Sequence, residues 1–202
     1  GRRDHRKPGS RGGELQAGDA VSEWEVDVLK EVQKVIIRKE RDTDVGAITQ
    51  VTRKAFANHP VSNQTEEFII HALRAANALT ISLVAEIDGR VVGHIAFSPV
   101  AITDDTPDWY GLGPVSVLPE RQKQGIGQSL INEGLTMLKE LGGQGCALVG
   151  DPSYYQKFGF RNVSQLVHEG VPPEVFQVLP LNNWEKLPKG SVVFHEGFWA
   201  TE

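Results

Sequence analysis

Residues 111–150 constrain the fold of this chain more than any other stretch. An apolar segment ending in GPVSVL leads into a polar junction with two glycines, then an amphipathic helix, then the short apolar segment GCALVG. Leu130, Ile131, Leu135 and Leu138 recur at helical spacing and give the helix one apolar face. A strand, a helix and a second strand in this order predict a parallel crossover, which requires a sheet with a helix on its face.

The junction between strand and helix, QKQGIG, has the composition of an anion site. Gly125 and Gly127 stand where glycine costs helix stability, but glycine admits a positive φ and lets a ligand approach the backbone. A helix N-terminus also presents free amides and a partial positive charge. The residues expected to surround a phosphate or pyrophosphate are Gln122, Lys123, Gln124, Gly125, Ile126, Gly127 and Ser129, with Arg121 nearby. An ordinary turn that enters a helix is the alternative interpretation of the same glycines.

Upstream of this unit the sequence predicts one short strand and two helices. VIIRKER, from Val35, is the strand candidate, and DVGAITQVTRKAF and NQTEEFIIHALRAANAL carry apolar residues at helical spacing. Asp42 or Asp44 is expected to cap the first helix. Asn63 and Glu66 have the three-residue spacing of a capping box at the start of the second.

The rest of the chain alternates strands with one short helix. In LTISLVAEIDGRVVGHIAFSPV apolar residues alternate around Asp88-Gly89, which predicts a β-hairpin with a type I′ turn. DPSYYQKFGF predicts a short helix that ends at Gly159. VFQVLPL and SVVFHEGF are the last strand candidates. Together these elements predict a mixed α+β fold, with a mixed sheet and helices on both faces.

Composition excludes several classes of protein. The net charge of −5 argues against nucleic acid as a partner, and the single cysteine, Cys146, excludes an intrachain disulfide and a cysteine-based metal cluster. No apolar run is long enough for a membrane helix, so we expect no membrane partner and a cytoplasmic location. Residues 1–33 are polar and rich in glycine and arginine. They are expected to form a flexible arm or a remnant of processing, and residues 34–202 the folded domain.

The junction and the later short helix resemble the GCN5-related N-acetyltransferase (GNAT) superfamily. That family follows a strand with Val-x-Pro-x-x-Arg/Gln-x-x-Gly-x-Gly/Ala, which this chain matches at Val117, Pro119, Gln122, Gly125 and Gly127. The family often carries Phe-Tyr-x-x-x-Gly-Phe on the short helix, where this chain has YYQKFGF. GDPSYYQKFGF and the later HEGF are similar to a branch of predicted bacterial N-acetyltransferases.

The resemblance spans about residues 34–199 and implies a cofactor as well as a fold. The fold is a central, mostly antiparallel mixed sheet, splayed between its fourth and fifth strands. The donor is acetyl-CoA and the product CoA, with the pantetheine arm along the fourth strand near Val115 and Val117. Pro114 has no N–H to donate to a neighbouring strand, so it suits a strand that leaves its neighbour, although it also suits an ordinary strand start.

The resemblance further implies that an amine attacks the thioester directly. Tyr155 matches the family's general acid, which also contacts the cofactor, and a phenol with a reference pKa of about 10 can protonate a leaving thiolate. Tyr154 is expected to pack. Glu86, on the more polar face of its strand, is the first candidate for a base. The other candidates are His94, Asp151, His195 and Glu196.

The acceptor is predicted only as a class, a small-molecule or peptide amine. Asp104, Asp105 and Asp108 crowd one loop and would favour a cationic acceptor, although a solvated surface loop has the same composition. A non-catalytic acyl-CoA-binding or sensing module is the alternative function, and Tyr155 favours the enzyme. A monomer and a homodimer both remain open.

Overall fold

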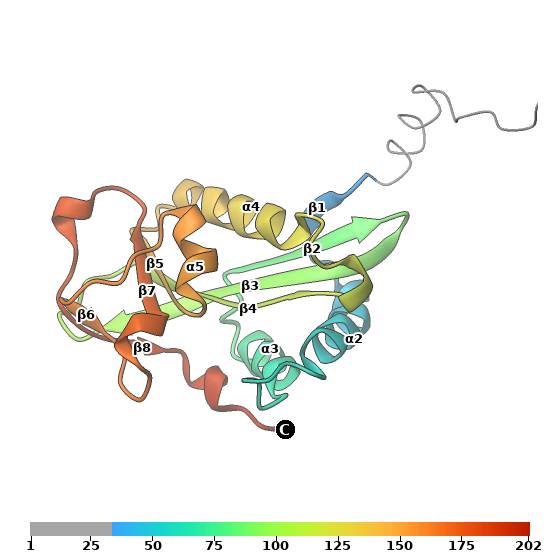
Figure 1. Ribbon diagram of the computed structural model, residues 1–202, viewed down its shortest axis with the longest axis horizontal. Coiled ribbons are helices and arrows are strands. Elements are labelled where there is room, and N and C mark those ends of the chain that lie inside the picture. The colour runs from blue at the N-terminus through green and yellow to red at the C-terminus, as the bar shows by residue number, and fades with distance from the viewer. Residues whose placement is uncertain (1–33) are drawn as a thin grey trace, which may run out of the picture. The chain divides into compact units, whose positions relative to one another are not determined.

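A mixed sheet forms the centre of the fold (Figure 1). The computed structural model describes residues 34–202, so the predicted arm at residues 1–33 lies outside the described residues. The strands follow the order β1-β2-β3-β4-β5-β7, in which only β4 and β5 pair in parallel. The predicted mixed sheet and parallel crossover are therefore confirmed. The strands are β1 (Ile36–Lys39), β2 (Ile81–Ile87), β3 (Arg90–Ile102), β4 (Trp109–Val117), β5 (Gly145–Val149) and β7 (Phe176–Pro180).

The end of β3 belongs to a second, smaller group of strands. Residues 100–102 pair with β8 (Gly190–Phe194), which pairs in parallel with β6 (Leu166–Val167). A separate apolar cluster packs here around Trp109 and Val192. The strands predicted near the end of the chain are therefore present as β7 and β8.

Helices cover both faces of the sheet, as predicted (Figure 1). α2 (Val45–Phe56) and α3 (Glu66–Ala75) lie on one face, and α4 (Ile126–Glu140) lies on the other; the short α5 (Pro152–Tyr155) follows β5. None of the helices in the described part of the chain is both long and apolar enough to cross a membrane. The 3-10 turns are η1 (Asp42–Asp44), η2 (Pro119–Arg121), η3 (Gln156–Phe158), η4 (Pro173–Val175), η5 (Trp184–Lys186) and η6 (Glu196–Trp199).

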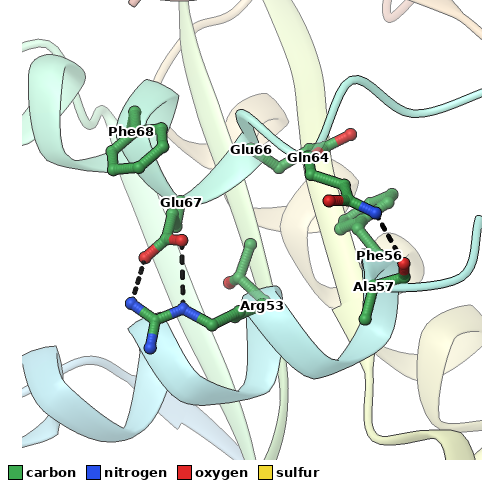
Figure 2. Close-up of a pocket in the computed structure, with 8 residues that line it drawn as sticks. Arg53, Phe56, Ala57, Gln64, Glu66, Glu67 and Phe68 are labelled. Carbon is green, nitrogen blue, oxygen red and sulfur yellow. Dashed lines mark hydrogen bonds and ion pairs between the residues drawn. The ribbon is translucent and has the colours of Figure 1, made fainter. Parts of the chain in front are cut away.

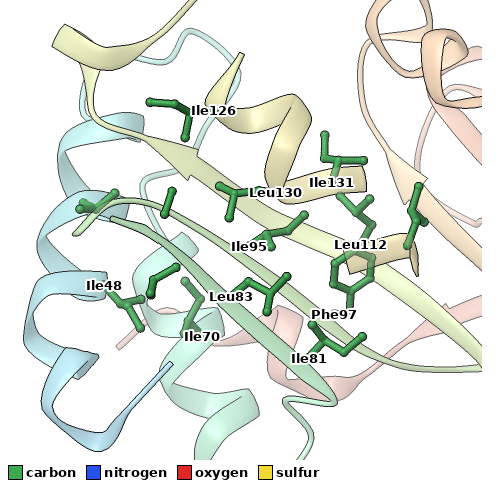
Figure 3. Packing of buried hydrophobic residues seen from close by; sticks show 14 of the residues in the cluster. Ile48, Ile70, Ile81, Leu83, Ile95, Phe97, Leu112, Ile126, Leu130 and Ile131 are labelled. Carbon is green, nitrogen blue, oxygen red and sulfur yellow. The ribbon is translucent and has the colours of Figure 1, made fainter. Parts of the chain in front are cut away.

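Apolar side chains of the helices on both faces pack against those of the sheet (Figure 3). Ile48 of α2, Ile70 of α3 and Leu130 of α4 are all buried. Helix and sheet approach closely at Gly134 of α4, where a Cβ would lie 2.2 Å from Cε2 of Phe97 in β3. Only glycine fits there, so the Phe97 ring packs directly against the helix backbone and holds α4 close to the sheet.

The sequence predicts the caps of α2 and α3 less well than the helices themselves. Asp44 precedes α2 as expected but makes no side-chain capping bond to it. Its carboxylate instead accepts two hydrogen bonds from the guanidinium of Arg38, at 2.7 and 3.0 Å. The predicted Asn63–Glu66 capping box is wrong, because Thr65 is the N-cap of α3 and Glu66 is the first helical residue.

His94 of β3 is a core residue. It is fully buried, and its Nε2 lies 2.7 Å from Oγ of Ser82 in β2. Burial and, to a smaller extent, the charge of Arg74 lower the pKa of His94 to about 3. The imidazole is therefore neutral at neutral pH.

We expect the free energy of unfolding to rise with pH between about 3 and 6.5, because the unfolded chain takes up a proton that buried His94 excludes. One proton corresponds to a slope of about 1.4 kcal/mol per pH unit. The substitution His94→Gln, which keeps a polar partner for Ser82, should remove this contribution. Denaturant titrations across this pH range measure the slope, and equal slopes in the two proteins would contradict the expectation.

Candidate active site

The sheet opens along one edge of β4. β4 and β5 pair only at the first three residues of each strand. Leu118 N donates to Val92 O of β3 (2.9 Å), and successive residues of a strand face opposite edges. Val115 and Val117, predicted to contact pantetheine, therefore direct their backbone groups away from β3, toward the open edge. The predicted splay between the fourth and fifth strands is confirmed.

Pro114 lies within the opened part of β4. The β3–β4 register shifts between Ile95 and Phe97, opposite Gly113 and Pro114. A residue without an N–H is tolerated here because this part of the ladder is already interrupted. The interrupted β3–β4 ladder therefore accounts for Pro114, while its interpretation as a sign that β4 leaves β5 stays a prediction.

The chain passes from β4 to α4 through the predicted glycine junction. Lys123 (φ 61°) and Gly125 (φ 84°) both have left-handed backbones, and Gly125 is the N-cap of α4. A Cβ at Gly125 would meet no atom within 4 Å, so the space beside this backbone is open. Helical bonding starts with Ser129 N, which donates to Gly125 O (3.0 Å), while Ile126 anchors the first turn in the core. The amides before Ser129 therefore have no intrahelical acceptor, as an anion site requires.

Polar side chains at the junction hold the loop in place. Gln122 Nε2 donates to Val117 O (3.0 Å), and Gln124 Nε2 donates to a backbone oxygen of η2 (3.3 Å). Ser129 Oγ donates to the carbonyl of the N-cap residue (3.0 Å). These side chains fix the shape of the loop, so any anion would meet mainly the backbone amides and the exposed Lys123.

Tyr155 lies beside the end of β5. A Cβ at Gly150 would lie 2.5 Å from Cε2 of Tyr155, so the ring packs directly on that glycine. The ring also meets Phe160 edge-on, with centroids 6.0 Å apart. Burial raises the pKa of Tyr155, and neighbouring Tyr154 raises it further. The phenol is therefore protonated at neutral pH.

Tyr154 packs against the core and edge-on against Tyr155, as predicted. It also reaches the start of α4, which the sequence did not predict. Its hydroxyl lies 3.4 Å from the position that a Cβ of Gly127 would occupy, and Val117 Cγ2 lies 3.8 Å from the same point. Lys157 Nζ is 4.8 Å from the centroid of the Tyr154 ring. One signal was present in the sequence: the related motif has Phe at this position, so this chain carries an additional hydroxyl.

Comparisons with known proteins identify the family. A family model described as an acetyltransferase (GNAT) domain matches residues 79–162, which contain the open edge, the junction and both tyrosines. The N-acetyltransferase YhbS of Escherichia coli K12 is 35% identical over 128 residues, which are 63% of this chain and 74% of YhbS. The chain belongs to the GNAT acetyltransferase family.

Solved structures of GNAT acetyltransferases share the fold over most of this chain. A family member from Brucella melitensis, solved in complex with acetyl-CoA, is 50% identical with a TM-score of 0.72, covering 82% of this chain and 98% of that one. YhbS from Escherichia coli, solved in complex with CoA, is 31% identical with a TM-score of 0.77, covering 84% and 94%. The predicted GNAT fold is confirmed.

Glu86, the predicted base of this GNAT acetyltransferase, lies in an ion-pair network. Its Oε2 accepts from Arg38 Nε (2.7 Å), and Arg38 also binds Asp44. β2 lies two strands from β4, or roughly 10 Å at a spacing of about 4.8 Å per strand. The catalytic role of Glu86 stays a prediction, and the network gives the residue a structural function.

Two other base candidates serve as local caps. Asp151 Oδ1 accepts from N and Oγ of Ser153 (3.0 and 2.8 Å) and caps α5. His195 Nδ1 accepts from Gly197 N (2.9 Å) at the start of η6. Their hydrogen bonds stabilise the starts of α5 and η6.

The acidic loop between β3 and β4 lies at the opposite end of β4 from the glycine junction. Asp104 accepts hydrogen bonds from Thr106 N and Lys189 N, both 2.9 Å, and these bonds lower its pKa. The carboxylate therefore ties the loop to the segment before β8. This structural role does not support the interpretation of the loop as the acceptor's entrance.

Proposed function

We propose that the protein transfers the acetyl group of acetyl-CoA to a primary amine of a small molecule or peptide. One observation carries the proposal: the open edge of β4 continues directly into the left-handed junction at the N-terminus of α4. The extended pantetheine arm and the pyrophosphate of the donor can therefore bind one continuous stretch of the chain, from Val115 to Gly127. The acetyl-CoA and CoA complexes of the two related structures support the same donor.

The residues of this stretch suit the two parts of the donor. The outward amides between Lys123 and Gly127, at the positive end of the α4 dipole, suit the pyrophosphate. The N–H and C=O of Val115 and the N–H of Val117 suit the amides of the pantetheine arm, in the manner of an added strand. The C=O of Val117 already accepts from Gln122 Nε2. When bound, the donor supplies a thioester, which is an activated acetyl group.

Tyr155 is the proposed general acid. A general acid must hold its proton until the leaving group departs, and burial keeps the Tyr155 phenol protonated. A β4 amide near Val117 is the proposed donor to the oxygen that gains charge during attack. The acceptor amine must arrive neutral, and an amine of pKa about 10.4 costs roughly 4 to 5 kcal/mol to deprotonate at pH 7.

Tyr154 and Lys157 extend the proposed cofactor site. The Tyr154 hydroxyl lies beside Gly127, and Lys157 places a cation on the same ring. The Tyr154 O–H can donate a neutral hydrogen bond to a pantetheine oxygen or a charge-assisted one to a phosphate oxygen, beside the N-terminus of α4. We assign Tyr154 to cofactor binding and Tyr155 to proton transfer.

The junction is tested by ligand-induced stabilisation. Acetyl-CoA at about a hundred times its Kd should raise the melting temperature by roughly 5–10 °C. Gly125→Asp should abolish the shift because it adds a negative charge at the anion site. Gly125→Asn is the matched control, since it has the same size and a similar tolerance of positive φ without the charge. An undiminished shift in Gly125→Asp would contradict the assignment.

For the acid, we expect Tyr155→Phe to lower kcat by about a hundred- to ten-thousand-fold with little change in the Kd for acetyl-CoA. Release of CoA measures turnover, and calorimetry measures binding. Full turnover in this variant would assign the proton to another donor. Tight binding of acetyl-CoA by the wild type without turnover of any amine would favour the alternative, an acyl-CoA-binding module.

Tyr154→Phe should have the opposite effect. Loss of one hydrogen bond should weaken CoA binding by roughly two- to tenfold and leave kcat nearly unchanged. Because the related family motif carries Phe here, we expect the variant to fold normally. Calorimetric titration with CoA measures the effect, and an unchanged Kd would remove Tyr154 from the cofactor site.

A further inference from the structure

A groove of about 270 Å³ lies between α2 and α3 (Figure 2). These two helices lie on the face of the sheet opposite α4 (Figure 1). It is lined by Thr52, Arg53, Phe56, Ala57, Gln64, Glu66, Glu67 and Phe68. Arg53 is the one cation among these lining residues, beside two carboxylates and two aromatic rings. This composition is unlike that of the acidic loop, since the aromatic residues add apolar surface to the charge.

The groove is connected to the cofactor strand. Thr52, which lines the groove, is buried, and its Oγ1 lies 3.4 Å from Oγ of Ser116 in β4. Ser116 stands between Val115 and Val117, whose backbone groups form the open edge. The buried Thr52 and Ser116 side chains therefore stand between a molecule in the groove and the segment of β4 along which we place the pantetheine arm.

The charge of Glu66 is not neutralised within the groove. Arg53 makes a two-point ion pair with Glu67, with bonds of 3.1 and 2.8 Å (Figure 2). Glu66 Oε1 accepts from Ser62 Oγ, while its Oε2 is buried and has no hydrogen-bond partner among residues 34–202. A buried carboxylate oxygen without a partner is costly, so it favours a ligand that brings a donor.

We propose that this groove binds a cationic group of the acceptor through Glu66, and that this group is not the amine that reacts. A carboxylate stabilises an ammonium and raises its pKa, which would keep a reacting amine protonated and unable to attack. The acceptor is therefore a primary amine with a second positively charged nitrogen, separated by an alkyl chain. This inference rests on the acetyltransferase function proposed above and names its substrate class.

The neighbouring side chains suit such an acceptor. Phe56 and Phe68 provide apolar contact for an alkyl chain and aromatic faces for a cation. Gln64, at φ 60°, holds its position through an exposed hydrogen bond from Nε2 to Ala57 O (2.6 Å). An exposed neutral bond contributes little stability, so Gln64 is the side chain that we expect to move when the ligand reaches Glu66.

A matched series of amines tests the substrate class. 1,4-Diaminobutane, butylamine and 4-aminobutanoate share one primary amine and a short alkyl chain, and they differ at the other end, which is an ammonium, a methyl group or a carboxylate. With wild-type protein and saturating acetyl-CoA, CoA release should give the highest kcat/KM for the diamine and the lowest for the amino acid. We expect about 10- to 100-fold between the diamine and butylamine, the effect of a hydrogen bond to a charged group.

Glu66→Gln then tests the residue. The variant keeps the size of the side chain and an acceptor for Ser62, and it should remove most of the preference for the diamine through a raised KM, with an unchanged Kd for acetyl-CoA. Glu133→Gln, which removes one negative charge from the exposed surface of α4, is the control and should keep the preference. Melting temperatures of both variants show that they fold.

The outcomes separate this inference from the function on which it rests. Absence of acetyl-CoA binding to the wild type would overturn the acetyltransferase proposal. Binding and turnover with equal kcat/KM for the three amines, or turnover of none of them, would overturn the dicationic acceptor class. A diamine preference that survives in Glu66→Gln would overturn the role of Glu66.

Discussion

The rest of the site depends on the unpaired edge of β4. Backbone N–H and C=O groups require partners, and β5 stops pairing with β4 after three residues. The edge runs from this point to the glycine junction, where the chain turns into α4. Close packing of Gly134 on Phe97 and burial of Ile126 hold α4 against the sheet, which places its free amides at the end of the same edge. One backbone feature therefore defines the position of every other group in the site.

Successive residues of β4 contribute to different parts of the protein. Val115 and Val117 turn their backbone groups to the open edge, near the tyrosines of α5, while Ser116 between them contacts Thr52 of α2. The donor site and the proposed acceptor groove are thus linked by the contact between Ser116 and Thr52, which lines the groove. Tyr154 and Tyr155 are also neighbours in sequence with different contacts. The Tyr154 hydroxyl lies near Gly127, and the Tyr155 ring packs on Gly150.

Periodicity and glycine positions predicted the sheet, the hairpin, the crossover and the junction, because these depend on local pattern. Contacts between distant segments were beyond that reasoning. Arg38 of β1 is the ion-pair partner of both Glu86 and Asp44. The predicted Asn63–Glu66 capping box is wrong because α3 starts at Glu66. Tyr154 was expected to pack, since no sequence rule places its hydroxyl beside a residue 27 positions earlier. The groove at Glu66 likewise exists only after α2 and α3 pack together.

Residue-resolved amide hydrogen exchange, with and without CoA, tests the central claim most directly. If CoA adds to the open edge and the junction, the amides of Val115, Val117 and residues 123–127 should become protected. Leu118 N, which already bonds to β3, should change little and serves as the internal control. Protection of the outward-facing amides alone is the predicted result. Binding of CoA without protection of Val115, Val117 and the junction would contradict the account.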